Sequence, residues 1–403
     1  MDQRRASMPN LSREVVVLSG VRTAIGDYGG SLKDIPPTDL GATVVREAIK
    51  RANVEAKEVG HLVFGNVIHS EAKDMYLSRV VCIQGGLPHE TPALTLNRLC
   101  GSGLQAIVTA AQTIMLGDAD VTVGGGAESM SRGGYLLPTL RWGTRMNETK
   151  VIDMMVGALT DPFDAVHMGI TAENVAAKWG ITRERQDAFA VESHRRAANA
   201  IDKGYFKEQI VPIEVKTKKG TVVFDTDEHV RRDVSPEGLA KLKPVFQKDG
   251  TVTAGNASGI NDGAAAVVLA EAKYAERKGL KPMARLVSYG HAGVDPKYMG
   301  IGPVPAVKKA LERAGLKIAD MDVIESNEAF AAQACAVAKD LDLDPAKTNP
   351  NGGAVALGHP IGATGAILTV KALYELQRIK GKYALVTMCI GGGQGIAAIY
   401  ERL

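Results

Sequence analysis

Polar and apolar positions along the chain predict helices that alternate with buried strands. The stretch 48–54 (AIKRANV) has the spacing of an amphipathic helix end, and it leads through a short acidic turn into the apolar run 62–66 (LVFGN). Apolar residues at helical spacing place one helix face on a core, whereas short continuous apolar runs are typical of strands buried on both faces. The pattern therefore predicts mainly parallel sheets covered by helices.

The same pattern returns about 260 residues later. The helix end 310–316 (ALERAGL) leads into the apolar run 323–327 (VIESN), and both runs finish on an asparagine, Asn66 and Asn327. Because solenoid repeats have periods of about 20–50 residues, a repeat of this length indicates duplication of a whole α/β half.

A second correspondence supports the duplication. A predicted helix over 104–116, a strand over 121–123 and a triple glycine have counterparts in a helix over 363–376, a strand over 384–388 and another triple glycine. The sequence therefore predicts two similar halves that pack against each other.

The segment between the halves has a different texture, richer in charge and turns, with predicted helices over 171–179 and 183–202. An insertion of this length is about the size of a domain. The loop 136–154 is too polar and irregular to be core, and loops this long are commonly functional or interfacial. We expect an N-terminal half over 1–130 plus 257–281, an inserted domain over 131–256 and a C-terminal half over 282–403.

Composition is that of a globular chain. Of 403 residues, 45% are hydrophobic and 23% are charged. The net charge of +3 is small for a chain of this length, which argues against a protein that binds nucleic acid through its positive electrostatic field. No apolar run approaches the length of about 20 residues that a membrane helix needs, so we expect no membrane span. A signal peptide would have an apolar segment after Arg4 and Arg5, and none follows them. Leu403 is not preceded by the Ser-Lys of a peroxisomal Ser-Lys-Leu signal, so a cytoplasmic protein is expected.

The four cysteines, Cys82, Cys100, Cys335 and Cys389, have neither metal-ligand spacing nor the pattern of a disulfide framework, so no metal site is expected. A single cysteine is most often a small buried apolar residue. The context of Cys100 differs, because it lies among glycines at the start of the predicted helix 104–116.

His359 lies at the corresponding start in the second half, again among glycines. If the halves pack about a pseudo-twofold axis, the two helix starts face each other. A helix N-terminus stabilises a thiolate, and a nearby imidazole can take the thiol proton. Taken singly, His359 is more often a polar residue with its hydrogen bonds satisfied, but the symmetric placement favours an active site.

Glycine makes up 44 residues of the chain and is dense in 358–365 (GHPIGATG) and 389–395 (CIGGGQG). Backbone N–H groups in such loops suit a reaction that develops negative charge on a carbonyl oxygen. Residues 101–106 also fit the dinucleotide pattern G-x-G-x-x-[GA], but the residue before the pattern is a cysteine and no acidic end of a second strand follows at the right distance, so support for a nicotinamide dehydrogenase is weak.

Several motifs occur in order along the chain: 97–103 (NRLCGSG), 125–131 (GGAESMS), 256–259 (NASG), 327–330 (NEAF), 358–365 and 389–395. With these motifs the sequence resembles the thiolases, in particular the biosynthetic branch, from Glu14 to Leu403. The resemblance implies a layered α-β-α-β-α fold of two halves, with the insertion as a coenzyme A-binding loop domain.

The activity implied is that of an acyl-CoA:acetyl-CoA C-acyltransferase, which condenses acetyl-CoA with a short acyl-CoA and cleaves 3-ketoacyl-CoA with CoA, by ping-pong transfer through an acyl-cysteine. Cys100 would be the nucleophile, His359 its base and Cys389 the second acid/base. Asn327, through a water, and His359 would form one oxyanion hole, and the N–H groups of Cys100 and Gly391 the other. By itself, Asn327 could equally be a strand-end cap.

Substrate contacts are also implied by the resemblance. The pair His167 and Met168 is typical of the biosynthetic branch and would line the acyl pocket. Ser258 would contact the pantetheine of CoA, and Arg231 its adenosine-diphosphate end. The implied substrate-binding residues are Arg231, Ser258, His167, Met168, Leu159, Phe246, Ala254, Met299, Ala329 and Phe330. The basic residues near Arg231 are otherwise read as a solvated face.

The resemblance implies no permanently bound cofactor, CoA thioesters as substrates, and a homotetramer that uses the 136–154 loop. Fatty acid metabolism or polyhydroxyalkanoate biosynthesis would be the setting. A decarboxylating β-ketoacyl synthase would carry His-His or His-Asn beside its nucleophile, whereas this chain has Cys389 and the 327–330 motif. A non-catalytic thiolase-like lipid carrier would lack Cys100, His359 or Cys389.

Overall fold

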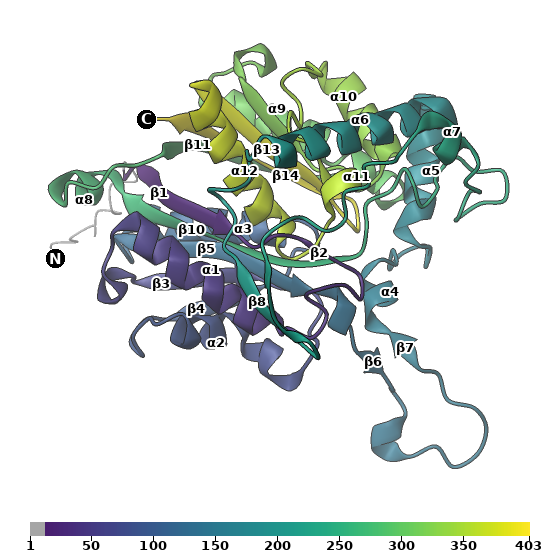
Figure 1. Ribbon diagram of the computed structural model, residues 1–403, viewed down its shortest axis with the longest axis horizontal. Helices are drawn as coiled ribbons and strands as arrows, with labels where there is room; N and C mark the ends of the chain where they lie inside the picture. Colours follow the sequence, from purple (N-terminus) through teal and green to yellow (C-terminus); the bar gives the residue numbers. More distant parts are fainter. Residues whose placement is uncertain (1–12) are drawn as a thin grey trace, which may run out of the picture.

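The computed structural model describes residues 13–403, so the segment with Arg4 and Arg5 lies outside the described residues. These residues build one ten-stranded sheet between helices (Figure 1). Its strands are β1 (Val15–Arg22), β2 (Gly26–Asp27), β3 (His61–Gly65), β4 (Ala93–Leu96), β5 (Val121–Ser129), β10 (Asn261–Glu271), β11 (Ala284–Gly293), β12 (Val323–Ser326), β13 (Tyr383–Ile390) and β14 (Gln394–Arg402).

The sheet consists of two similar halves. Strands follow the order β4-β3-β5-β10-β1 in one half and β11-β14-β13-β12 in the other. The halves meet where β1 pairs with β11, and that pairing is short, with Val16 opposite Arg285 and Val17 opposite Ala284. The duplication predicted from the sequence thus has a structural counterpart in each half.

The prediction of mainly parallel sheets is wrong. Parallel pairing joins β3 to β4 and β5, and β12 to β13. Antiparallel pairing joins β1 to β10 and β11, β10 to β2 and β5, and β14 to β11 and β13. The triple glycine 391–393 is a tight turn from β13 into β14, and a short turn allows only antiparallel neighbours. Its expected counterpart 124–126 lies inside β5 instead, so the two triple glycines are not equivalent.

Helices form three layers around the two halves of the sheet (Figure 1). Helices α1 and α2 cover the outer face of the first half, α9 and α10 lie on the outer side of the second, and α3 and α12 lie between the halves. Their bounds are α1 (Pro37–Ala52), α2 (Leu77–Gln84), α3 (Ser102–Leu116), α9 (Pro303–Ala314), α10 (Ala331–Leu341) and α12 (Thr364–Ile379). The predicted five-layer thiolase arrangement is confirmed.

The middle layer explains part of the glycine excess. A Cβ on Gly103 of α3 would lie 2.7 Å from the backbone N of Ala366, and one on Gly365 of α12 would lie 2.3 Å from the N of Leu104. Contacts this short exclude any side chain. The two helix starts can therefore cross in direct backbone contact.

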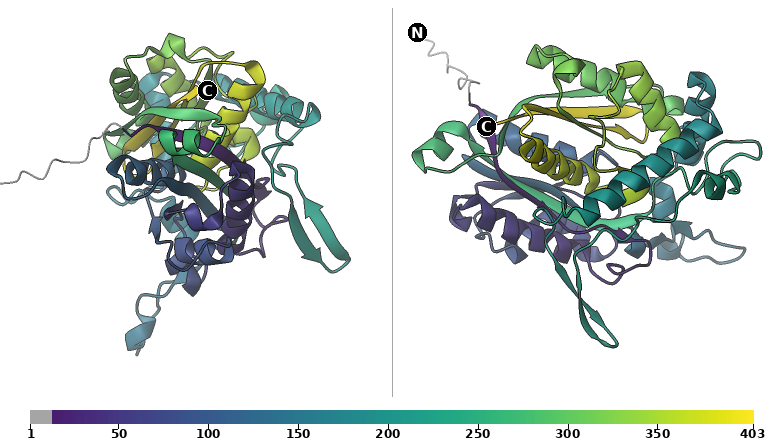
Figure 2. Two further views of the ribbon diagram at one scale, coloured as in Figure 1. Left: turned by 90° about the vertical axis from the view of Figure 1, so that its left-hand side faces the viewer. Right: turned by 45° about the horizontal axis from the view of Figure 1, so that its top comes forward.

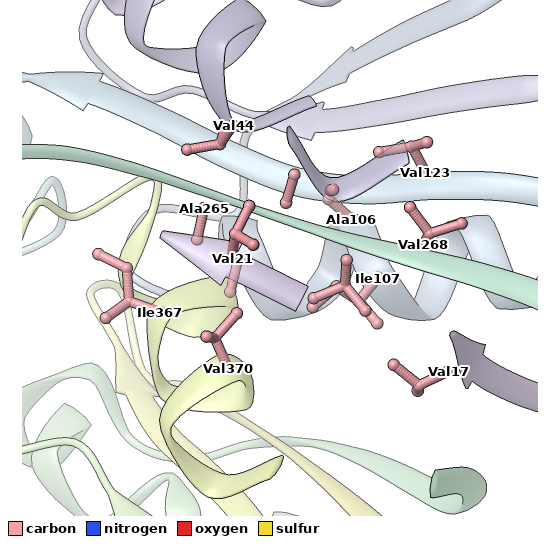
Figure 3. Close-up of a cluster of buried hydrophobic side chains, with 14 of the residues drawn as sticks. Val17, Val21, Val44, Ala106, Ile107, Val123, Ala265, Val268, Ile367 and Val370 are labelled. Atoms are coloured by element: carbon pink, nitrogen blue, oxygen red, sulfur yellow. The ribbon is translucent and has the colours of Figure 1, made fainter. Parts of the chain in front are cut away.

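The main core lies where the middle helices meet the first half of the sheet. Figure 3 shows small and branched side chains from several strands and helices pointing into one cluster. They interdigitate because β-branched residues pack well on a pleated surface. The labelled residues are Val17, Val21, Val44, Ala106, Ile107, Val123, Ala265, Val268, Ile367 and Val370.

One segment is more apolar than expected. The 18 residues Leu99–Leu116 have the length and hydropathy of a membrane-crossing helix, and 56% of them are buried inside the molecule. The expectation that no run approaches such a length is therefore wrong. Because α3 packs on β3, β5, β10, β14 and α12, its apolar surface faces protein on several sides, which is typical of a central core helix.

The segment between the halves contains short strands and helices beside the sheet. Its elements are β6 (Tyr135–Leu136), β7 (Ile152–Asp153), α4 (Met154–Ala158), α5 (Met168–Trp179), α6 (Arg183–Asp202), β8 (Ile213–Thr217), β9 (Gly220–Phe224) and α7 (Pro236–Ala240). Both predicted helices are confirmed. Two hairpins, β6–β7 and β8–β9, project from the body (Figures 1 and 2). Helix α8 (Ala272–Arg277) connects β10 to β11.

Candidate active site

Cys100 lies in a tight turn between β4 and α3. The Ser102 hydroxyl donates to the carbonyl of Leu99 at 2.7 Å and accepts from the N–H of Arg98 at 2.8 Å. Leu99 has a φ of +46°, a strained conformation for a branched residue. Strain of this kind persists where the surroundings enforce it and is common at functional sites. The turn holds Cys100 directly before the N-terminus of α3.

His359 is fixed by its own loop. Its backbone N–H donates to Oδ1 of Asn261 at 2.9 Å, and its Nδ1 lies 2.7 Å from the hydroxyl of Thr364. That hydroxyl already donates its single hydrogen to the carbonyl of Pro360 at 2.9 Å, so it accepts from Nδ1–H. The remaining nitrogen, Nε2, is therefore the unprotonated one and is available as a base.

Asn327 follows β12 and faces that free nitrogen, with its Nδ2 lying 3.5 Å from Nε2 of His359. Its backbone N–H donates to the carbonyl of Thr387 on β13 at 3.0 Å. The side chain is completely buried, and its Oδ1 has no hydrogen-bond partner among the described residues. A buried polar atom of this kind calls for an explanation beyond a strand-end cap.

Cys389 lies at the end of β13, two residues before the glycine turn, and is completely buried. Burial raises its pKa, and the neighbouring Cys100 raises it further. Burial also raises the pKa of Cys100 to about 11, against the opposing effect of the N–H groups of Gly391 and of Cys100 itself. Both side chains are therefore thiols at neutral pH, and each needs a base to become a nucleophile or a proton acceptor.

Burial lowers the pKa of His359 to about 4. The imidazole is consequently neutral at physiological pH, with Nε2 able to take a proton. A neutral base that lines the same cavity as two protonated thiols can activate a cysteine for covalent catalysis.

The three side chains open into one cavity of about 350 Å³. No Asp, Glu, Lys or Arg is among the described residues that line it, so its few polar groups determine how a ligand is oriented. Of the predicted site residues, the cavity walls include Cys100, His359, Cys389, Gly391, Ser258, His167, Met168, Leu159, Phe246, Ala254, Met299, Ala329 and Phe330.

One wall is built on the start of α5. Nδ1 of His167 accepts the N–H of Gly169 at 3.0 Å and so caps the helix. The His167 ring stacks on Phe246 with 4.7 Å between centroids and 17° between planes. A Cβ on Gly169 would lie 2.2 Å from the Phe246 ring, so only glycine permits this stack. The predicted pair His167 and Met168 thus lies in the cavity wall.

Two predicted residues lie elsewhere. Asn327 contacts His359 from behind the cavity lining. Arg231 is exposed and does not line the cavity, and its backbone N–H donates to Nδ1 of His194 at 3.1 Å. Sequence reasoning missed wall residues whose apolar side chains carry no chemical signal, among them Leu99, Met130, Val245, Ile260 and Ile361.

The model of the thiolase N-terminal domain matches residues 15–273, and that of the thiolase C-terminal domain matches residues 280–402. The chain belongs to the thiolase family. A beta-ketothiolase BktB of Cupriavidus necator is 68% identical to this thiolase over 394 residues, which cover 98% of this chain and 100% of the relative. An acetyl-CoA acetyltransferase of Syntrophomonas wolfei is 52% identical, with 98% and 100% covered.

Solved thiolase structures have the same fold. The human mitochondrial 3-ketoacyl-CoA thiolase superposes with a TM-score of 0.96 at 48% identity, covering 98% of this chain and 100% of that one. A structure of the human enzyme in complex with CoA superposes with a TM-score of 0.95 at 47% identity, covering 98% and 99%. The prediction of a thiolase, an enzyme of the acyltransferase class, is confirmed.

Proposed function

We propose that this thiolase catalyses the reversible condensation of acetyl-CoA with acetyl-CoA or another short acyl-CoA, and the CoA-dependent cleavage of 3-ketoacyl-CoA. The observation that carries the proposal is the meeting of two thiols, one neutral imidazole and the Gly391 backbone at one cavity. The names of its relatives, a beta-ketothiolase and acetyl-CoA acetyltransferases, support the same chemistry.

In the first half-reaction, Nε2 of His359 takes the proton of the Cys100 thiol, and the resulting thiolate attacks the thioester carbonyl. The departing CoA thiolate receives that proton and leaves as a thiol, while the acyl group stays on Cys100. We propose that the N–H groups of Cys100 and Gly391 hold the oxyanion that forms on the thioester carbonyl, and their effect of lowering the pKa of the Cys100 thiol supports this role.

In the second half-reaction, Nε2 of His359 takes the proton of the Cys389 thiol, and the resulting thiolate takes a proton from the α-carbon of acetyl-CoA. The enolate then attacks the acyl-cysteine, and the sulfur of Cys100 leaves as a thiol with the proton that His359 held. We propose that Nε2 of His359, when protonated, and Asn327 through a water hold the enolate oxygen. The 3.5 Å contact between these two side chains supports this role, as does the lack of a partner for Oδ1 of Asn327 within residues 13–403.

CoA would enter along the inserted segment, with Ser258 and the residues of the cavity wall against pantetheine. We propose Arg231 as a phosphate contact because its side chain is exposed and the next residue, Arg232, is an exposed cation as well. The division into halves 1–130 plus 257–281 and 282–403, with a loop domain over 131–256, is likewise a proposal. The short strands and helices of that middle segment, which lie outside the two halves of the sheet, support it.

We further propose a homotetramer that uses the β6–β7 hairpin. The segment 136–154, which the sequence predicted to be a polar loop, exposes large apolar side chains: Trp142 is 87% exposed, Met146 83% and Leu140 65%. Such apolar side chains on a projecting hairpin gain burial when a second subunit covers them. A cytoplasmic enzyme of fatty acid or polyhydroxyalkanoate metabolism, with no permanently bound cofactor, completes the proposal.

Initial-rate kinetics tests the function. Rates of acetoacetyl-CoA thiolysis at several fixed CoA concentrations should give parallel double-reciprocal lines, because the first product leaves before CoA reacts. The Cys100→Ala variant should be inactive, whereas Cys82→Ala, a matched change at a buried cysteine away from the cavity, should turn over like the wild type. Intersecting lines, or an active Cys100→Ala variant, would refute the proposal.

A further inference from the structure

Glu128, near the end of β5, is a completely buried carboxylate that lies outside the cavity lining. Its Oε1 accepts from the side-chain N–H of Asn66 at 3.0 Å and from the backbone N–H of Ile68 at 3.0 Å. Its Oε2 accepts from the backbone N–H of Val67 at 3.1 Å and of Gly362 at 2.8 Å. Burial raises the pKa of Glu128 to about 8, and the backbone N–H groups of Ile68, Val67 and Gly362 oppose that rise. All four partners are donors, and no acceptor for a carboxyl proton lies among the described residues, so the geometry favours the carboxylate anion.

These donors come from two loops on opposite halves of the molecule. Asn66, Val67 and Ile68 follow β3 in the first half, whereas Gly362 lies three residues after His359 in the loop of the second half. A Cβ on Gly126 of β5 would lie 2.2 Å from the carbonyl oxygen of Gly362. The His359 loop is therefore pressed directly onto β5, where Glu128 accepts the N–H of Gly362.

The duplication gives this position a counterpart. Gly65 of β3 lies opposite Gly126 of β5, and Ser326 of β12 lies opposite Thr387 of β13. The next residue on the first strand of each pair is an asparagine, Asn66 or Asn327. Two residues further along the second strand is Glu128 in one half and Cys389 in the other. The two halves thus place a buried asparagine and a buried ionisable side chain at equivalent positions.

The second half uses its pair at the cavity, whereas the first half uses its pair for support. Cys389 lines the cavity and Asn327 faces Nε2 of His359. Glu128 and Asn66 bind each other instead. Glu128 also accepts from the backbone of the two loops, and Asn66 donates to the carbonyl of Ala127 on β5. Glu128 is nonetheless close enough to the nucleophile for its negative charge to raise the pKa of Cys100.

We infer that Glu128 is a positioning residue that fixes the His359 loop of the second half against the Cys100 turn of the first. This inference rests on the roles proposed for Cys100 and His359. A neutral amide in place of the carboxylate would direct an NH₂ group at two of the four donors and leave them unpaired in the interior. The loop would then move, and with it the base that serves both half-reactions.

The test compares Glu128→Gln with the wild type in single-turnover acetylation of Cys100 and in exchange of the α-protons of acetyl-CoA with deuterated water. Both rates should fall in parallel, by about 10–100-fold, because small displacements of a catalytic group have effects of this size. KM for acetoacetyl-CoA should change less than about threefold, since Glu128 does not line the cavity.

The matched control is Glu271→Gln, a buried carboxylate that accepts the N–H of Tyr274 at the opposite end of its strand from the site. It should lower the melting temperature without changing either rate. If Glu128→Gln does not fold, Asn66→Ala removes one of the four donors, so that the carboxylate which accepts the N–H of Gly362 is held less firmly. That variant should slow both steps several-fold.

Unchanged rates in folded Glu128→Gln or Asn66→Ala would overturn the inference, as would a loss of acetylation alone or a change confined to KM. These outcomes are distinct from failure of the proposed function, in which the wild-type protein itself would not acetylate Cys100.

Discussion

Replacing Cys389 by serine separates the two half-reactions. The change keeps the shape of a completely buried side chain, so the cavity should be preserved. Acetylation of Cys100 depends on Nε2 of His359 and on the N–H of Gly391, and neither is altered. We therefore expect Cys389→Ser to acetylate Cys100 within about threefold of the wild-type rate.

Proton transfer at the α-carbon should be lost. Burial and the adjacent Cys100 already raise the pKa of the Cys389 thiol, and a hydroxyl at the same place is a far weaker acid. A positioned acid/base group contributes about 10²–10⁴ in rate, which corresponds to about 3–5 kcal/mol of activation free energy. Condensation and deuterium exchange into acetyl-CoA should fall by that factor.

The assay combines quenched single turnovers, in which acetylated Cys100 is counted by mass spectrometry, with deuterium uptake into the methyl group of acetyl-CoA. Cys335→Ser is the matched control, because Cys335 is a buried cysteine of the same apolar cluster that does not line the cavity. If Cys389→Ser abolished acetylation as completely as exchange, Cys389 would act on the nucleophile itself, and the division of roles would be wrong.

Three further predictions follow from exposed and buried groups. Arg231→Ala should raise KM for CoA thioesters with little loss of kcat and should weaken the dependence of KM on salt, and an unchanged KM would count against a phosphate contact. Shortening the hairpin 136–152 should convert tetramers into active dimers in light scattering, and a monomeric wild-type protein would refute the proposed assembly. The pKa of His359 is about 4 in the folded protein and about 6.5 in the unfolded chain. The contribution of the neutral imidazole to the unfolding free energy is therefore fully present above pH 6.5 and is lost as the pH falls towards 4. Between pH 7 and 4, His359→Asn should lose about 3 kcal/mol less unfolding free energy than the wild type in urea titrations, and equal losses would contradict a buried neutral imidazole.

The sequence predicted those features that depend on local pattern. The duplicated halves could be recognised because helix ends, apolar runs and terminal asparagines repeat in order. The turn around Cys100 and the loop around His359 could be recognised because glycine marks places where backbone must approach backbone closely.

Features set by tertiary contacts were harder to predict. The alternation of helices and strands favoured parallel sheets, yet β10 and β14 return antiparallel, and only the glycine turn 391–393 gave a local signal of this. Glu128 lies in a recognised motif, but its role depends on Gly362, which is 234 residues away along the chain. Cavity walls such as Met130 and Ile361 carry no chemical signal in the sequence.

The central claim, that this thiolase carries the acyl group on Cys100, is tested most directly by mapping the acetylated peptide. After incubation with acetyl-CoA and rapid acid quenching, we predict one added acetyl group, on the peptide that contains Cys100, and its loss on addition of CoA. An acetyl group on another residue, or labelling that persists in Cys100→Ala, would contradict the account.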